Sequence, residues 1–130
     1  LRKDPLVSGK EPKDIAPIVA KTLIGNIENK HVYEQLVDSM NRLHKFSYIK
    51  SIEASVKSDH TDILNKIDVP TLVVVGELDT LTPPSLAKEI ASEIDNAKLE
   101  IIKGAGHLSN IEQPDIFNKK VISFLANSSI

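Results

Sequence analysis

Cysteine and tryptophan are both absent from this chain of 130 residues, and methionine occurs only once. Without cysteine the chain can form no disulfide, no thiolate metal site and no cysteine nucleophile. Disulfides are rare in reducing compartments, so their absence is compatible with an intracellular protein. We therefore expect a cytoplasmic location.

Long apolar runs and an excess of one charge are also missing. No stretch approaches the roughly 18 residues that are needed to span a bilayer. The first five residues carry positive charge with no apolar segment behind them, unlike a signal peptide. The formal net charge is −2, which differs from the basic footprint of a nucleic-acid binder. We expect neither a membrane nor a nucleic acid as partner, and the 41% hydrophobic content indicates a globular chain.

The first half of the chain has helical periodicity. Apolar residues recur there at spacings of three and four, as on one face of a helix. Helices are predicted over residues 12–25, 30–46 and 61–67, with a weaker helical segment over 48–56. Residues 1–60 are therefore predicted to form a helical segment of their own, followed by a different arrangement over residues 61–130.

The second half alternates short β-branched runs with helices. Residues 70–76 form a continuous apolar run closed by glycine, which is typical of a strand buried on both faces. A helix is predicted to begin after Thr82 as its cap, a second strand over 98–102, and a last helix over 114–125. This order predicts an α/β fold in which the two strands are parallel and joined by a right-handed crossover.

Asp79 and His107 follow the two predicted strands, each a few residues beyond the strand end. Because the carboxyl ends of parallel strands meet at one edge of a sheet, we expect the two side chains to lie together. An aspartate bonded to one imidazole nitrogen fixes the tautomer and stabilises the imidazolium. Each residue alone also fits a structural role: Asp79 as a turn former or helix cap, and His107 as a solvated loop residue.

Two motifs resemble the α/β-hydrolase family. The string IDVPTLVVVGELD at residues 67–79 resembles the family's penultimate strand with the acid loop behind it. The strings GAGHL at 104–108 and EQP at 112–114 resemble its histidine loop and final helix. Residues 1–60 are similar to a cap domain by position and helical character only. The likeness is greatest to small esterases and lactonases such as 3-oxoadipate enol-lactonases.

This resemblance implies that Asp79 is the acid and His107 the histidine of a catalytic triad, with no metal or organic cofactor. The family's nucleophile elbow, Gly-x-Ser-x-Gly, does not occur in the chain. We therefore expect the carboxy-terminal part of a hydrolase of esters, lactones or related carbonyl compounds, inactive alone. Two alternatives stay open: a non-catalytic binding module, or one chain of a split hydrolase whose partner supplies the serine.

The resemblance also implies an open sheet edge. In the family, the strand over residues 71–75 pairs on its far side with an earlier strand. Without that neighbour, an exposed hydrophobic edge invites pairing with another chain. We therefore expect the isolated chain to self-associate.

Overall fold

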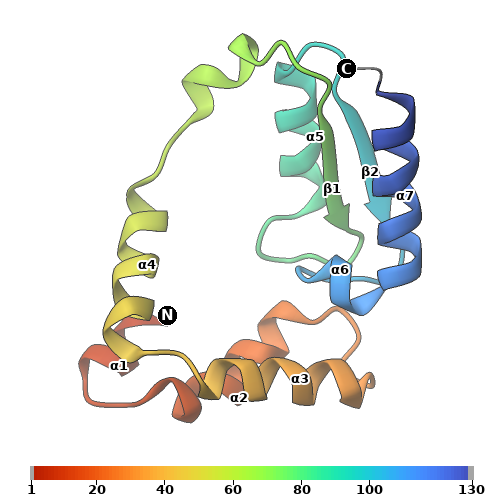
Figure 1. Cartoon of the computed structure of the whole chain (residues 1–130). Coiled ribbons are helices and arrows are strands. Elements are labelled where there is room, and N and C mark those ends of the chain that lie inside the picture. The colour runs from red at the N-terminus through yellow and green to blue at the C-terminus, as the bar shows by residue number, and fades with distance from the viewer. Residues whose placement is uncertain (1, 129–130) are drawn as a thin grey trace. The chain divides into compact units, whose positions relative to one another are not determined.

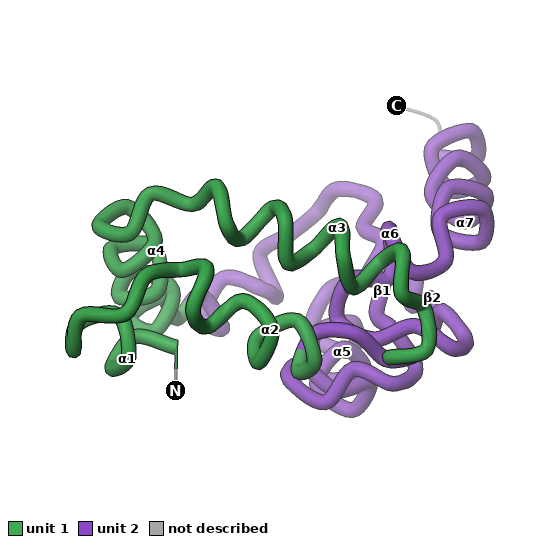
Figure 2. The backbone as a smooth tube through the Cα atoms, turned by 90° about the horizontal axis from the view of Figure 1, so that it is seen from below, with its two compact units in different colours: residues 1–22, 27–59 green, residues 23–26, 60–130 purple. Residues whose placement is uncertain are grey.

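The computed structural model describes residues 2–128 (Figure 1). The chain forms two compact units, shown in different colours in Figure 2. Unit 1 contains residues 2–22 and 27–59 of the described chain, and unit 2 contains Leu23–Asn26 together with residues 60–128. The short segment Leu23–Asn26 thus belongs to a unit whose other residues lie much later in the sequence. Whether residues 1–60 act as a cap stays a prediction.

Unit 1 is helical. Its helices are α1 (Lys3–Val7), α2 (Pro12–Leu23), α3 (Lys30–Asn41) and α4 (Lys45–Lys57). Helices α1 and α4 are joined by an ion pair in which Lys3 Nζ lies 2.6 Å from Glu53. The buried apolar side chains of this unit belong to Leu6, Ile15, Ala16, Val19, Ala20, Val32 and Met40.

The prediction of one helix over residues 30–46 was wrong. Helix α3 ends at Asn41, and α4 begins at Lys45. His44 between them has an extended backbone, and its Nδ1 lies 3.0 Å from Ser47 Oγ at the start of α4. No glycine or proline marks this break in the sequence. The apolar spacing continues through it, and therefore predicts one helix where the structure has two.

Unit 2 contains the parallel sheet. Its elements are η1 (Thr61–Lys66), β1 (Leu72–Gly76), α5 (Pro84–Glu93), β2 (Lys98–Ile102), α6 (Ser109–Glu112) and α7 (Pro114–Asn127). Strands β1 and β2 are parallel, in a register that aligns Leu72 with Lys98 and Gly76 with Ile102. Helices α5 and α7 lie on opposite sides of this sheet (Figure 1). The predicted α/β fold with parallel strands is thus confirmed.

Large apolar side chains of unit 2 stay exposed. Within residues 2–128 the sheet has two strands, so the far edge of β1 has no strand partner there. The first three residues of β1 are only half-buried, and Leu86 of α5 is 40% exposed. Leu86, Ile116 and Leu125 have the helical spacing of buried residues, yet they are 40%, 41% and 63% exposed. Two strands offer too little surface to cover these helix faces.

Candidate active site

The loops behind β1 and β2 are joined by backbone contacts. The N–H of Glu77 donates to Ile102 O at 2.9 Å, and the N–H of Leu78 donates to Ala105 O at 2.8 Å. Gly76 faces the same loop, and a Cβ there would collide with the carbonyl oxygens of Ala105 and Gly106. The two strand ends therefore meet at one edge of the sheet, as the parallel arrangement requires.

Asp79 is buried at this edge, with only 6% of its surface exposed. Its Oδ1 accepts hydrogen bonds from the backbone N–H groups of Leu81 (2.9 Å) and Thr82 (3.0 Å). Burial alone would raise the pKa of this carboxyl, but hydrogen bonds from Thr82, His107 and Leu81 outweigh it and hold the pKa below its ordinary value. Asp79 is therefore an ionised acceptor at neutral pH.

Thr82 is a partner of Asp79 that sequence analysis assigned to another role. We predicted it as the cap of the following helix, but α5 begins at Pro84 with Pro83 in the cap position. The Thr82 hydroxyl instead donates to Asp79 Oδ2 at 2.8 Å, and its oxygen lies 3.2 Å from His107 Nδ1. The side chain thus helps to hold the carboxylate rather than the helix end.

His107 lies against Asp79. Its Nδ1 is 2.9 Å from Asp79 Oδ2, and the histidine side chain is 36% exposed. An ionised carboxylate can only accept, so Nδ1 carries the proton in this pair. Within residues 2–128 the hydrogen bonds of the ring involve Nδ1, which leaves Nε2 as the nitrogen free to exchange a proton. The structure brings the two predicted site residues together; their catalytic role stays a prediction.

Two glutamates hold the loop that carries His107. Glu77 is exposed, and its Oε2 accepts from the N–H of Gly104 at 2.9 Å. The sequence did not predict a role for the Glu112 side chain in this site. Glu112 is buried, and its two carboxylate oxygens accept from the backbone N–H groups of Gly106 and Gly25, each at 2.8 Å. An acidic residue five positions after the histidine was the only signal in the sequence.

A cavity of about 320 Å³ lies beside the pair. Its lining residues are Val73, Val74, Val75, Gly76, Asp79, Thr82, Leu86, Ala87, Ile90, His107 and Ser109. The cavity thus joins the polar pair to an apolar wall made by β1 and α5. Small-molecule sites typically combine an apolar wall with a few polar groups in this way.

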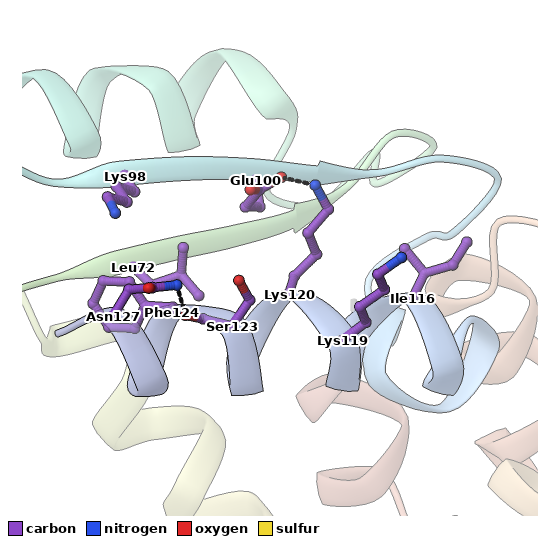
Figure 3. A pocket seen from close by; sticks show the side chains of 9 residues that line it. All are labelled: Leu72, Lys98, Glu100, Ile116, Lys119, Lys120, Ser123, Phe124 and Asn127. Carbon is purple, nitrogen blue, oxygen red and sulfur yellow. Dashed lines mark hydrogen bonds and ion pairs between the residues drawn. The ribbon is translucent and has the colours of Figure 1, made fainter.

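A second groove, of about 400 Å³, lies between the sheet and α7 (Figure 3). It contains Lys98, Glu100 and Phe124, and Lys120 Nζ lies 2.9 Å from Glu100 within it. Neither Asp79 nor His107 lines this groove. Across residues 2–128 there is also no group of three or more side chains that could hold a metal ion, and no helix long and apolar enough to cross a membrane.

A family model described as "TAP-like protein", one of the α/β-hydrolase models, matches residues 46–130. This chain belongs to the α/β-hydrolase family. The matched region includes both strands, Asp79, His107 and Glu112.

Known α/β hydrolases resemble the chain in sequence and structure. A proline iminopeptidase from Thermoplasma volcanium is 34% identical over 113 residues, which cover 87% of this chain and 35% of that enzyme. A 2-hydroxy-6-oxononadienedioate/2-hydroxy-6-oxononatrienedioate hydrolase from Cupriavidus pinatubonensis is 33% identical over 88 residues, 66% of this chain and 30% of that enzyme. The structure of an enol-lactonase from Burkholderia xenovorans matches 97% of this chain and 49% of its own, with a TM-score of 0.89 and 26% identity. The chain thus spans about a third of these curated relatives and about half of the solved structure.

Proposed function

We propose that this chain contributes the acid and the histidine of a serine hydrolase, and that a segment outside these 130 residues supplies the nucleophile. The observation that carries the proposal is the 2.9 Å contact between Asp79 Oδ2 and His107 Nδ1 at the joined ends of two parallel strands. On this proposal the chain is the carboxy-terminal part of the hydrolase, since the family's nucleophile precedes its acid and histidine. A cytoplasmic location is part of the same proposal.

The residues of the chain divide the acid–base work between them. His107 Nε2 takes the proton of the serine hydroxyl as that oxygen attacks the substrate carbonyl. Asp79 keeps the ring in the Nδ1–H tautomer and stabilises the imidazolium that forms. The protonated Nε2 then gives its proton to the leaving alcohol, and the acyl-serine intermediate is hydrolysed by water that His107 activates in the same way.

We propose an ester, a lactone or a related carbonyl compound as the substrate. The apolar wall beside His107, made by Val73, Val74 and Leu86, supports a substrate with an apolar acyl portion. The relatives' names cover an enol-lactonase, a dienedioate hydrolase and an iminopeptidase, so they support carbonyl chemistry rather than one substrate.

The test compares two lengths of chain on an activated ester such as p-nitrophenyl acetate. We expect the 130-residue chain to show no turnover above buffer, because it contains no Gly-x-Ser-x-Gly. A chain extended upstream of Leu1 into such an elbow should hydrolyse the ester, and its elbow Ser→Ala variant should not. Turnover by the 130-residue chain that His107→Ala abolishes would contradict the proposal. An upstream frame without an elbow would favour a binding module, and a co-purified chain that carries one would favour a split enzyme.

We also propose that the 130-residue chain associates with itself through the free edge of β1. That edge has no strand partner within residues 2–128, and Leu72, Val73 and Val74 of β1 are only half-buried. Unpaired backbone N–H and C=O groups next to apolar side chains favour pairing with a second copy. Light scattering at micromolar concentration should give a mass at least twice the 14.3 kDa of the monomer. A stable monomer in this measurement would count against this interface. So would a Val74→Lys variant that elutes as the wild type does.

A further inference from the structure

Glu112 is a buried carboxylate, with 7% of its surface exposed, and no ion pair in the described part of the chain includes it. A buried charge is costly unless hydrogen bonds satisfy it. Here two backbone donors do so: Gly106 N–H bonds to Oε1 and Gly25 N–H bonds to Oε2, both at 2.8 Å. The carboxylate therefore bridges two chain segments that lie far apart in sequence.

These two segments also bond to each other. The N–H of His107 donates to Leu23 O at 2.9 Å. A Cβ on Gly106 would lie 2.8 Å from the same oxygen, and a Cβ on Gly25 would lie 2.9 Å from the carbonyl carbon of Ala105. The loop before His107 is thus pressed against Leu23–Asn26, with Glu112 bonded to both. Two consecutive amides are thus held by hydrogen bonds: that of Gly106 by Glu112, and that of His107 by Leu23 O.

The two oxygens of a carboxylate suit these two donors. The carboxylate offers an accepting oxygen to each N–H, whereas an amide of the same shape offers one oxygen and one NH₂ group. With glutamine at position 112, the NH₂ group would face an N–H and leave that buried donor unsatisfied. The site therefore distinguishes two side chains of equal size by their hydrogen-bonding capacity.

We propose that Glu112 is a positioning residue for His107, acting through the amides of Gly106 and Gly25. Glu112 fixes both segments that meet in the hydrogen bond between His107 N–H and Leu23 O. It thereby holds the imidazole where Nδ1 reaches Asp79 Oδ2. This role rests on the proposed function for its catalytic meaning. Its physical content, the orientation of one ring, can be measured without any reaction.

The experiment is a nitrogen-15 NMR spectrum of the histidine rings in the 130-residue chain, at a pH where the His107 ring is neutral. Long-range proton–nitrogen correlations report which ring nitrogen carries the proton. In the wild type we expect the Nδ1–H tautomer of His107 to predominate. In Glu112→Gln we expect this predominance to be lost, because the displaced ring no longer meets Asp79 squarely.

The matched control is Glu77→Gln. Glu77 uses one oxygen to accept from Gly104 in the same loop, which glutamine can also do, so the His107 tautomer should stay as in the wild type. A folded Glu112→Gln chain, judged by circular dichroism, that keeps the wild-type tautomer would overturn the proposal. An equal loss of the Nδ1–H tautomer in Glu77→Gln would also overturn it, because any change in the loop would then be enough to displace the His107 ring.

If Glu112→Gln does not fold, hydrogen exchange of the wild type decides. The amides of Gly25, Gly106 and His107 should exchange together with one common protection factor, because they open as one unit. Separate rates for Gly25 and Gly106 would overturn the proposal. A tautomer loss in Glu112→Gln combined with an upstream frame that lacks a nucleophile would keep the positioning role and refute the proposed hydrolase.

Discussion

Replacing Gly76 with alanine should lower the free energy of unfolding by at least about 3 kcal/mol, and so leave little folded unit 2. The added Cβ would collide with the carbonyl oxygens of Gly106 and Ala105 and lie 2.8 Å from the Ala105 carbonyl carbon. These are backbone atoms, which cannot swing aside as the end of a flexible side chain can. Relief would require moving the whole loop that carries His107. Urea unfolding followed by circular dichroism measures the change.

Gly104→Ala is the control for this effect. Gly104 lies in the same loop with a φ of +70°, and an added Cβ would meet only the Gln113 side chain, at 3.6 Å. Its cost is therefore the strain of a left-handed backbone, about 1–2 kcal/mol. If Gly76→Ala were as mild as Gly104→Ala, the loops behind β1 and β2 would not be pressed together as the structure shows.

Replacing Asp79 with asparagine in the enzyme extended to include its nucleophile should lower kcat by about 10⁴-fold. Asparagine can accept at Oδ1 from Leu81 and Thr82, so the turn can persist. Its NH₂ group would then face His107 Nδ1 and favour the ring form in which Nδ1 is unprotonated. Nε2 would carry the proton and could no longer remove one from the serine. Steady-state hydrolysis of an activated ester measures the loss.

Two other acidic residues provide controls for Asp79→Asn. Asp95→Asn changes an exposed carboxylate outside the site and should keep kcat within about twofold of wild type. Glu77→Gln tests the other acidic residue behind β1 and should leave most of the activity, because Glu77 contacts Gly104 rather than the ring. A kcat loss of less than tenfold in Asp79→Asn, or a larger loss in Glu77→Gln, would assign the acid elsewhere.

The sequence predicted the fold of unit 2 from local signals. The apolar run that forms β1 and the Thr-Pro-Pro sequence before α5 are signals that a few neighbouring residues carry. The parallel pairing of the strands follows from the order of strand, helix and strand. Helix burial was less predictable, because it depends on what covers each face. Leu86 and Leu125 have the spacing of buried residues, yet the surface that would cover them is not provided by a sheet of two strands.

The candidate site was predictable only in part for a similar reason. Strand order alone placed Asp79 near His107. Thr82 was assigned to the helix because a threonine before proline is a common cap, and the competing carboxylate three residues earlier took its hydroxyl instead. Glu112 depends on Gly25, which lies 87 positions away in the chain. Pairings at such distance leave no periodic trace in one sequence.

The attachment of Leu23–Asn26 to the later unit has a consequence for the order of synthesis. This segment is synthesised before its partners Gly106, His107 and Glu112, and Glu112 follows Gly25 by 87 positions. Loop closure over so long a stretch is slow compared with the formation of single helices. The helices around the segment can form during translation, whereas the hydrogen bonds that support the His107 loop cannot form until Glu112 has been made. A newly made molecule therefore acquires the geometry of the ring later than the helices that precede it.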